Sequence, residues 1–374
     1  METVYLAAIC AVVPGLGRRR LPALLQRLGG AKNVFEASSD DLKAAGVCMP
    51  QAIDKFVYHR DKSLPEKLQL FCERQKIQLI SIYDKAYPES LRMIADPPLV
   101  LYVKGSLPKE EYNFAVVGAR ACTEYGVRAA SYFSKALTHD GIPIISGGAK
   151  GIDTAAHKAC IDAGGKTVAV FGCGIDIAYP AENRKLFAKI AEQGALVSEF
   201  APGMQPLPSN FPARNRIIVG LSQGVLVAEA SIRSGAVITA NIAADEGRDV
   251  YCVPGNIFDG NSEGCHELIR TGAKLVDNVN HILEDKYSWQ KLMKNYVSQP
   301  SIFDIMQEEK KPAPIQTETK LGEKLLKLLQ AGAMPLEYLT EQSGESFAAV
   351  SMELLDLQVA GLVAVDKAQR YYRK

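Results

Sequence analysis

The sequence predicts an α/β fold built on a doubly wound parallel sheet in the middle of the chain. Between residues 76 and 285, short runs rich in Val and Ile alternate with helical patterns. Most of these runs are continuously apolar, as expected for strands that are buried on both faces of a sheet. Three of them end in glycines just before a helix begins, at Gly118, at Gly147 and Gly148, and at Gly172 and Gly174. Right-handed crossovers would bring these turns to one side of the sheet.

Length and composition are those of a globular protein with two or three domains. The 374 residues are 47% hydrophobic and 23% charged, and the net charge is +1. A site for nucleic acid would therefore have to come from local clustering of cations. The eight cysteines form no Cys-x-x-Cys pair, which disfavours zinc and thioredoxin-like chemistry. Because we find no signal peptide and no apolar run of membrane-spanning length, we expect a cytoplasmic protein with reduced thiols and no membrane association.

The first 75 residues are predicted to form a small all-helical domain. Helical patterns cover about 3–11, 18–28, 40–45, 50–60 and 64–75. Between the first two lies VPGLGRRR (residues 13–20), which resembles the Pro-Gly-x-Gly turn of helix-hairpin-helix motifs. Such a turn exposes backbone N–H groups to a DNA phosphate, so the domain is SAM-like or helix-hairpin-helix-like and Arg18 is a candidate DNA contact. The alternative is a plain helical hairpin that only packs.

Residues 76–285 are predicted to form the large α/β domain. Its predicted strands are 77–82, 99–104, 114–118, 143–146, 167–171, 195–199, 224–229, 249–253 and 273–276. Helical patterns at about 124–139, 151–163, 182–193, 235–246 and 263–270 separate the later strands. Strands that alternate with helices in this way indicate βαβ units and a sheet with helices on both faces.

Residues 286–318 are predicted to be a linker and residues 319–374 a winged-helix domain. Prolines and a mixed Glu-Glu-Lys-Lys run are typical of a connecting segment. The last segment shows three short helical patterns and then a hairpin-like run at 362–372. Its third helix, at about 345–360, carries three carboxylates and no Lys or Arg, which argues against ordinary binding in the major groove. A protein-contact or regulatory role is at least as well supported as DNA binding.

The glycine turns do not match the two common nucleotide-binding fingerprints. The first turn, GARACT (118–123), lacks the second and third glycines of GxGxxG, and GCGID (172–176) lacks the third. SGGAKG (146–151) lacks the spacing and the Lys-Ser/Thr pair of a P-loop. A nicotinamide cofactor and ATP hydrolysis are therefore disfavoured, and we expect no cofactor. Three such loops, each followed by the free N–H groups of a helix start, favour a chain of phosphates.

A second dense motif is FPARNRIIVGLS (211–222), in which Arg214 and Arg216 flank an asparagine beside an apolar helix. Arginines that are buried need an anion or a carboxylate as partner. That partner is either a DNA phosphate or an internal salt-bridge cluster, for example with Glu199 or Glu229. Both interpretations could hold for different members of the motif.

The glycine turns and the FPARNR motif together resemble the DNA-processing protein A family (DprA, also called Smf). The resemblance rests on VVGAR (116–120), SGGAKGIDTAAH (146–157), GCGID (172–176), YPAEN (179–183), FPARNRIIVGLS (211–222), EAS (229–231), SGAVITA (234–240), GRDV (247–250) and VPG (253–255). It covers about residues 80–285 and implies an extended Rossmann-like domain. It also implies a homodimer that binds single-stranded DNA, loads the RecA recombinase onto it during natural transformation, and displaces single-strand binding protein.

The resemblance further implies which residues bind the single strand. The family's arginine after the first Val-Gly strand corresponds to Arg120, and its lysine in the Ser-Gly loop corresponds to Lys150. The other implied contacts are Gly118, Ser146, Gly147, Gly148, Arg214, Asn215 and Arg216, and further candidates are Gly174, Tyr179, Ser234 and Gly235. A cation beside oriented N–H donors holds a phosphate, and several in line hold a strand without reading its sequence. Tyr179 and Phe211 are candidates for base stacking, with core packing the alternative for Phe211.

We expect neither a catalytic site nor a metal site. Asp153 and His157 lie one helical turn apart, but N-capping by Asp153 is the simpler interpretation. The alternative function is that of a nucleotide N-glycosidase, like the related cytokinin-activating phosphoribohydrolases. Their PGGxGTxxE loop supplies a catalytic glutamate, and the corresponding stretch here, residues 229–237, has none at that spacing.

Overall fold

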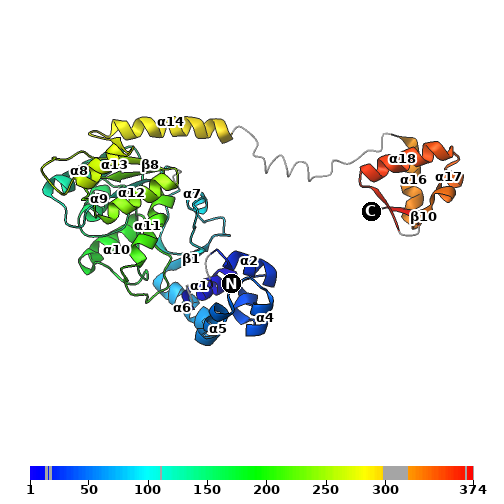
Figure 1. Cartoon of the computed structure of the whole chain (residues 1–374), viewed down its shortest axis with the longest axis horizontal. Helices are drawn as coiled ribbons and strands as arrows, with labels where there is room; N and C mark the ends of the chain where they lie inside the picture. The colour runs from blue at the N-terminus through cyan, green and yellow to red at the C-terminus, as the bar shows by residue number, and fades with distance from the viewer. Residues whose placement is uncertain (13–15, 17–18, 110–111, 298–318, 367–368, 374) are drawn as a thin grey trace. The chain divides into compact units, whose positions relative to one another are not determined.

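The computed structural model describes the chain except for residues 13–15, 17–18, 110–111, 298–318, 367–368 and 374 (Figure 1). The chain divides into two compact units, Met1–Gln290 and Lys291–Lys374, which are described separately below. The candidate DNA contact Arg18 and most of the predicted linker lie outside the described residues.

Six helices form the first 75 residues. They are α1 (Glu2–Val12), α2 (Leu21–Leu28), α3 (Ala31–Glu36), α4 (Ser39–Ala44), α5 (Pro50–His59) and α6 (Leu64–Gln75). The sequence predicts all of them except α3, a six-residue helix whose first N–H is bound by the Glu2 carboxylate at 2.6 Å. Because this partner lies 29 residues away, the local pattern around α3 gives no sign of it.

The helical segment and the sheet share one hydrophobic core. Apolar residues of α1, α3, α5 and α6 pack in the same cluster as residues of β1, β2, β5 and α10. Helix α1 contacts β1 and β2 directly. The segment 1–75 is therefore part of the first compact unit, and its separation as a domain of its own stays a prediction.

A nine-stranded sheet with the order β1-β2-β6-β5-β4-β3-β7-β8-β9 forms the centre of the first unit. Its strands are β1 (Ile77–Ser81), β2 (Val100–Gly105), β3 (Phe114–Val117), β4 (Ile144–Ser146), β5 (Thr167–Val170), β6 (Ala195–Ser198), β7 (Gly224–Val227), β8 (Asp249–Cys252) and β9 (Lys274–Leu275). Strands β3 to β9 run parallel, as predicted. At one edge the sheet is not parallel, because β2 runs antiparallel to both β1 and β6.

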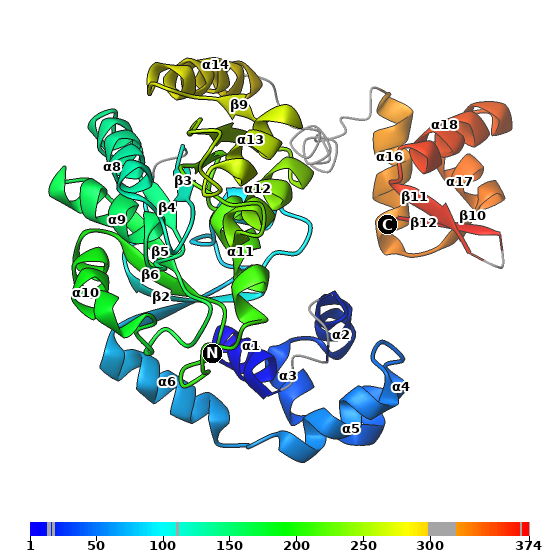
Figure 2. The same ribbon diagram turned by 60° about the vertical axis from the view of Figure 1, so that its left-hand side comes forward.

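Helices cover both faces of the sheet, which confirms the doubly wound architecture (Figure 2). The remaining helices of the first unit are α7 (Glu89–Arg92), α8 (Glu124–His139), α9 (Ile152–Asp162), the 3-10 turn η2 (Ala181–Asn183), α10 (Arg184–Gln193), α11 (Asn210–Gly220), α12 (Gly235–Asp245) and α13 (Glu263–Arg270). Helix α14 (Asn280–Val297) begins in this unit and continues past its last residue, Gln290. Alternate residues of the central strand β3 pack against the helices on the two faces of the sheet. Phe114 and Val116 pack in the cluster that includes residues of α8 and α9, whereas Ala115 and Val117 pack in the cluster with α11 and α12.

The order of the strands reverses at β3, which lies between β4 and β7. In open α/β sheets such a reversal leaves a crevice beyond the carboxyl ends of the strands, because the two following loops diverge to opposite faces. The glycine turns after β3 and β4 and the serine-rich turn after β7 all open at this edge. The topology thus brings together motifs that are up to about a hundred residues apart in sequence.

The second unit is a winged-helix domain, as predicted. It contains α16 (Lys320–Leu328), the 3-10 turn η3 (Leu329–Ala331), β10 (Met334–Pro335), α17 (Leu336–Ser343), α18 (Phe347–Val359), β11 (Val363–Val365) and β12 (Arg370–Arg373). Three strands in the order β10-β12-β11 form its small sheet. The predicted linker begins at residue 286, but helix α14 continues to Val297, so the first part of that segment is helical.

Candidate nucleic-acid interface

Two adjoining cavities lie at the carboxyl edge of the sheet. The larger, of about 590 Å³, is bordered by the turns after β3 and β7 and by α11, and we call it the β3–β7 pocket. The smaller, of about 400 Å³, is bordered by the turns after β4 and β5, and we call it the β4–β5 pocket. Both are lined by Arg120, Ala149, Tyr179, Phe211 and Arg214. The two cavities therefore adjoin at these five residues.

Arg120 lies in the turn after β3 and is exposed to solvent. Its guanidinium carbon is 5.1 Å from the centre of the Phe211 ring, within the range of a cation–π contact. Backbone hydrogen bonds hold the turn on both sides, because the Ala119 N–H donates to Glu229 O at 2.8 Å and the Ile152 N–H donates to Ala119 O at 3.2 Å. The cation is therefore presented at the mouth of both pockets on a fixed turn.

Lys150 lies in the turn after β4 and lines the β4–β5 pocket. Its ammonium is 2.6 Å from the Glu182 carboxylate, and the two side chains are 58% and 66% exposed. The hydrogen bond from Lys150 lowers the pKa of Glu182. Exposed pairs of this kind contribute little stability, since water solvates both partners well. An incoming phosphate could take the place of Glu182 at small cost.

The predicted glycine contacts pack tightly against neighbouring residues of the loops. A Cβ atom on Gly147 would lie 2.6 Å from the Arg214 guanidinium, and one on Gly118 would lie 2.5 Å from Ile152 Cγ1. Gly148 has a φ of 70° and faces the ring of Phe187. Ser146 is fully buried, and its hydroxyl donates to Val116 O at 2.6 Å. Gly118 and Gly147 line the cavities, whereas Ser146 and Gly148 support the turn from behind.

Arg214 supports the turn after β4 from inside the protein. Its side chain is buried and donates to Gly147 O at 2.7 Å and to Val170 O. Burial lowers the pKa of Arg214 to about 10, and the nearby carboxylate of Asp153 opposes that shift. Asn215, also buried, accepts a hydrogen bond from Arg214 Nε at 3.3 Å and lines the β3–β7 pocket.

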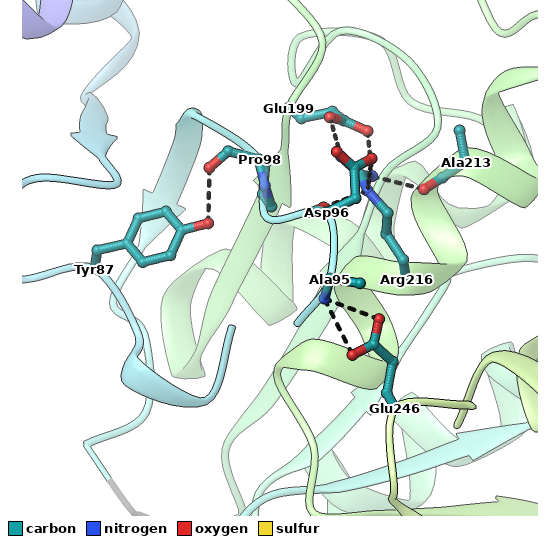
Figure 3. Close-up of polar contacts among 8 residues, drawn as sticks. All are labelled: Tyr87, Ala95, Asp96, Pro98, Glu199, Ala213, Arg216 and Glu246. Carbon is teal, nitrogen blue, oxygen red and sulfur yellow. Dashed lines mark hydrogen bonds and ion pairs between the residues drawn. The ribbon is translucent and has the colours of Figure 1, made fainter. Parts of the chain in front are cut away.

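Arg216 lies in an internal ion-pair cluster, the alternative that the sequence left open (Figure 3). Its guanidinium donates to both carboxylate oxygens of Glu199 at 2.7 Å and to Asp96 Oδ2 at 3.1 Å. It lines neither pocket. Glu229, the other carboxylate considered, instead accepts hydrogen bonds from the backbone and hydroxyl of Thr123 at the start of α8. We therefore leave Arg216 out of the proposed set of DNA contacts.

The further candidates take different positions around the pockets. Tyr179 is exposed, lines both pockets, and has its ring centre 5.5 Å from that of Phe211. Ser234 caps α12 by accepting the Ala236 N–H at 3.2 Å, and it lines the β3–β7 pocket together with Gly235. Gly174 is buried and lines neither cavity.

Asp153 and His157 are structural residues of α9. The expectation that Asp153 caps the helix needs correction, because Gly151 is at the cap and Asp153 lies in the first turn. Its carboxylate accepts the Ala149 N–H at 3.1 Å and so braces the lysine turn. Burial raises the pKa of Asp153 and lowers the pKa of His157 to about 3. His157 is therefore neutral, with Nδ1 2.7 Å from the Thr167 hydroxyl.

Several residues at the interface are absent from the sequence prediction. Glu182 pairs with Lys150, and Ser231, Thr239 and Asn261 line the β3–β7 pocket. Glu182 and Ser231 lie inside motifs that carry the family resemblance, which is a signal that could have identified them. Asn261 lies in the segment before α13, where the sequence carries no motif.

The described residues contain no group of three or more His, Cys, Asp or Glu side chains arranged to hold a metal ion. Within the same part of the chain, each helix is too short or too polar to cross a lipid bilayer.

Comparison with known proteins identifies related sequences over both units. A protein-family model described as DNA recombination-mediator protein A matches residues 78–286, and one described as the DprA winged helix domain matches residues 309–367. The chain is 48% identical to the DNA processing protein DprA of Streptococcus pneumoniae over 214 residues, which are 57% of this chain and 76% of the relative. It is 33% identical to the protein Smf of Synechocystis over 97% of this chain and 96% of the relative.

Solved structures give the same result. The X-ray structure of DNA processing protein A from Streptococcus pneumoniae matches with a TM-score of 0.65 and 39% identity, and covers 75% of this chain and 97% of its own. A structure of DNA processing protein A from Helicobacter pylori matches with a TM-score of 0.51 and 26% identity, and covers 57% of this chain and 98% of its own. The latter structure concerns the unique single-stranded DNA binding mode of the Helicobacter pylori protein.

Proposed function

This chain belongs to the DNA recombination-mediator protein A family, and from that premise we propose that it binds single-stranded DNA along the β3–β7 and β4–β5 pockets. The observation that carries the proposal is that Arg120 and Lys150 lie on neighbouring turns and both line the β4–β5 pocket, while Arg120 also lines the adjoining β3–β7 pocket. Each cation lies on a loop between a strand of the sheet and the helix that follows it, at the edge where parallel sheets bind ligands. The related protein from Helicobacter pylori, with its single-stranded DNA binding mode, supports the choice of ligand.

In this proposal the strand lies with its phosphates on the cations and one base against the aromatic pair. Tyr179 and Phe211 stand between the two pockets, and Arg120 lies over the Phe211 ring. Stacking on aromatic rings tolerates every base, because each base has a π face. Binding is therefore expected to show little sequence preference.

We further propose that the protein acts as a homodimer, through its Rossmann-like domain, that loads RecA onto the bound strand in natural transformation and displaces single-strand binding protein. The role is that of a mediator in recombination, not of an enzyme. Among the described residues that line the β3–β7 pocket, Asp153 is the only carboxylate, and it is already engaged by the Ala149 N–H. The N-glycosidase alternative would need a free carboxylate there, and release of free base from nucleoside monophosphates is its test.

The test of DNA binding compares cations inside and outside the pockets. We expect Arg120→Ala and Lys150→Ala each to weaken binding of labelled oligo-dT about tenfold, because each removes a charge-assisted hydrogen bond to a phosphate. The slope of log affinity against log salt should fall by about 0.7 for each cation removed. The control is Lys158→Ala, which removes the same charge from an exposed position on α9 that lines neither pocket. Unchanged affinity in the Arg120→Ala/Lys150→Ala double variant would remove the proposed site.

The RecA step needs its own measurement. We expect the protein to accelerate RecA filament assembly on oligo-dT coated with single-strand binding protein, and the double variant to lose that acceleration. If oligo-dT binding is intact and filament assembly is not accelerated, the binding proposal stands and the loading proposal fails.

A further inference from the structure

The recognition helix of the winged-helix unit buries one face and leaves the other without a partner among the described residues of that unit. Val350, Leu354 and Leu357 of α18 pack into the core of the unit with Leu325, Leu339 and Val363. These residues hold α18 against the core of the unit, and its other face is exposed.

That opposite face carries a stripe of apolar side chains. It consists of Ala348, Met352, Leu355 and Val359, and the last three are 70%, 59% and 85% exposed. Single exposed apolar residues are ordinary on protein surfaces, but an aligned set of this kind is typical of an interaction site. The spacing of four, three and four residues is that of the seam along which one helix packs against another. The stripe therefore fits a helical partner.

The charge around the stripe decides what kind of helix fits. Helix α18 carries carboxylates and has no Lys or Arg. Asp356 and Glu353 lie on α18 itself, beside the stripe. A nucleic acid would be repelled by this surface, because its phosphates need cations. A second copy of α18 would bring like charges together, which is unfavourable at a helix interface.

We propose that the stripe on α18 is the docking site for a basic amphipathic helix of another protein. The partner's apolar side chains would cover Met352, Leu355 and Val359, and its flanking Lys or Arg residues would pair with Asp356 and Glu353. This mode is the helix-in-groove type of recognition, in which apolar anchors supply affinity and charges set the choice of partner. The winged helix thus has a surface for protein at the position where DNA-binding relatives of this fold read bases.

The test uses the full chain and designed peptides of about three heptads, with Leu at the seam positions and Lys on both flanks. Fluorescence anisotropy should show saturable binding of the Lys-flanked peptide that weakens with salt. A peptide with Glu in place of Lys, and a scrambled peptide of the same composition, should not bind. Equal binding of the Lys and Glu peptides, or no binding of the Lys peptide, would overturn the proposal.

Variants locate the binding on α18. Met352→Glu/Leu355→Glu should weaken peptide binding at least about tenfold, since both anchors lose apolar burial. The matched control, Gln330→Glu/Gln342→Glu, adds the same charge at exposed positions outside α18 and should bind normally. Asp356→Lys keeps the apolar stripe and should weaken binding of the Lys peptide. Circular dichroism checks that each variant is folded. If Met352→Glu/Leu355→Glu binds the peptide as tightly as Gln330→Glu/Gln342→Glu does, the peptide contacts another surface and the proposal is wrong.

Two further measurements distinguish helix docking from self-association and from DNA binding. Sedimentation should give the same mass for the wild-type chain and Met352→Glu/Leu355→Glu. A smaller mass for the variant would make a second copy the occupant and overturn the proposal. Affinity for oligo-dT should be equal in the two proteins, so that a failure of helix docking is distinct from a failure of DNA binding.

Discussion

Arg120, Arg214 and Arg216 carry the same guanidinium group but lie in three different environments. Arg120 is exposed over the Phe211 ring, Arg214 is buried behind the turn after β4, and Arg216 is held by Glu199 and Asp96. On a helix, residues two apart point roughly 200° away from each other, so Arg214 and Arg216 cannot serve one ligand. The cations of the proposed site that are exposed and can contact a phosphate are therefore Arg120 and Lys150.

In the proposed site, Glu182 would compete with a DNA phosphate for Lys150. We expect Glu182→Gln to tighten oligo-dT binding about twofold to fivefold at low salt, because the variant removes a carboxylate 2.6 Å from the ammonium and lessens repulsion of phosphate. The gain should shrink as salt rises, since the interaction is screened. Fluorescence titrations at several salt concentrations measure it. Weaker binding by Glu182→Gln would instead assign Glu182 a role in positioning Lys150.

His157 makes stability depend on pH. Burial lowers its pKa from the ordinary 6.5 to about 3, so below pH 6.5 the unfolded chain binds a proton that the folded chain does not. The free energy of unfolding should therefore fall as pH falls from about 6.5 towards 3, by up to about 1.4 kcal/mol per pH unit. The raised pKa of Asp153 acts in the opposite sense between 3.8 and its folded value.

Urea denaturation of wild type and His157→Gln between pH 7 and 5 isolates the histidine, because the contribution of Asp153 is common to both. We expect the difference in unfolding free energy to change by about 1 kcal/mol per pH unit below pH 6. His139→Gln, at an exposed position on α8, is the control and should follow wild type. Parallel curves for His157→Gln and wild type would contradict the assignment.

At the scale of elements, the site depends on how the turns after β3 and β4 interlock. Gly151, which precedes α9, has a φ of 77°, and a Cβ there would lie 2.3 Å from Ala119 O and 2.6 Å from Arg120 O. The turn that carries Arg120 and the start of the helix after Lys150 are thus in backbone contact. A side chain at residue 151 would push the two turns apart.

Gly151→Ala should therefore affect both stability and DNA binding. We expect it to lower the free energy of unfolding by about 3 kcal/mol, from left-handed backbone strain and a clash with backbone atoms. Gly164→Ala is the matched control, because Gly164 has a φ of 76° with nothing within 4 Å of a Cβ, and it should cost about 1 kcal/mol. Oligo-dT affinity, measured well below the unfolding transition, should fall in Gly151→Ala and not in Gly164→Ala. Equal costs in the two variants would show that the turns are not interlocked.

At the scale of the whole molecule, the proposed DNA site and the acidic helices α17 and α18 lie in different units. The net charge is only +1, yet the proposed DNA site in the first unit presents Arg120 and Lys150, and α17 and α18 of the second unit carry carboxylates without cations. The cations of the second unit that the structure describes near its hairpin include Arg370 and Arg373, on β12. This division predicts separate roles for the two units.

Removal of the second unit tests that division. We expect the chain 1–290 to bind oligo-dT within about twofold of the full chain, because phosphate contacts come from cations and α18 has none. Anisotropy titrations at matched salt measure the two affinities, and thermal melts check that the shortened chain is folded. A drop of tenfold or more would assign DNA contacts to the winged helix, with Arg370 and Arg373 as the first residues to substitute.

The sequence by itself determined most of the elements, because strand and helix patterns depend on neighbours within one or two turns of chain. It predicted the nine strands of the large sheet, the winged helix, and the positions of Arg120 and Lys150 next to glycine turns. It did not reveal α3, whose first N–H is bound by Glu2, or the antiparallel pairing of β2 with β6. Both depend on residues that are distant along the chain.

Only the tertiary structure decided which side chains of the FPARNR motif are available to a ligand. The sequence shows two arginines in a row of apolar residues, and either could meet a phosphate or a carboxylate. The packing of α11 turns Arg214 towards Gly147 and Arg216 towards Glu199. Which side chains of a helix are buried, and which residues they contact, depends on how the helix is rotated about its axis against its neighbours. That rotation is fixed by the whole fold and not by the local sequence.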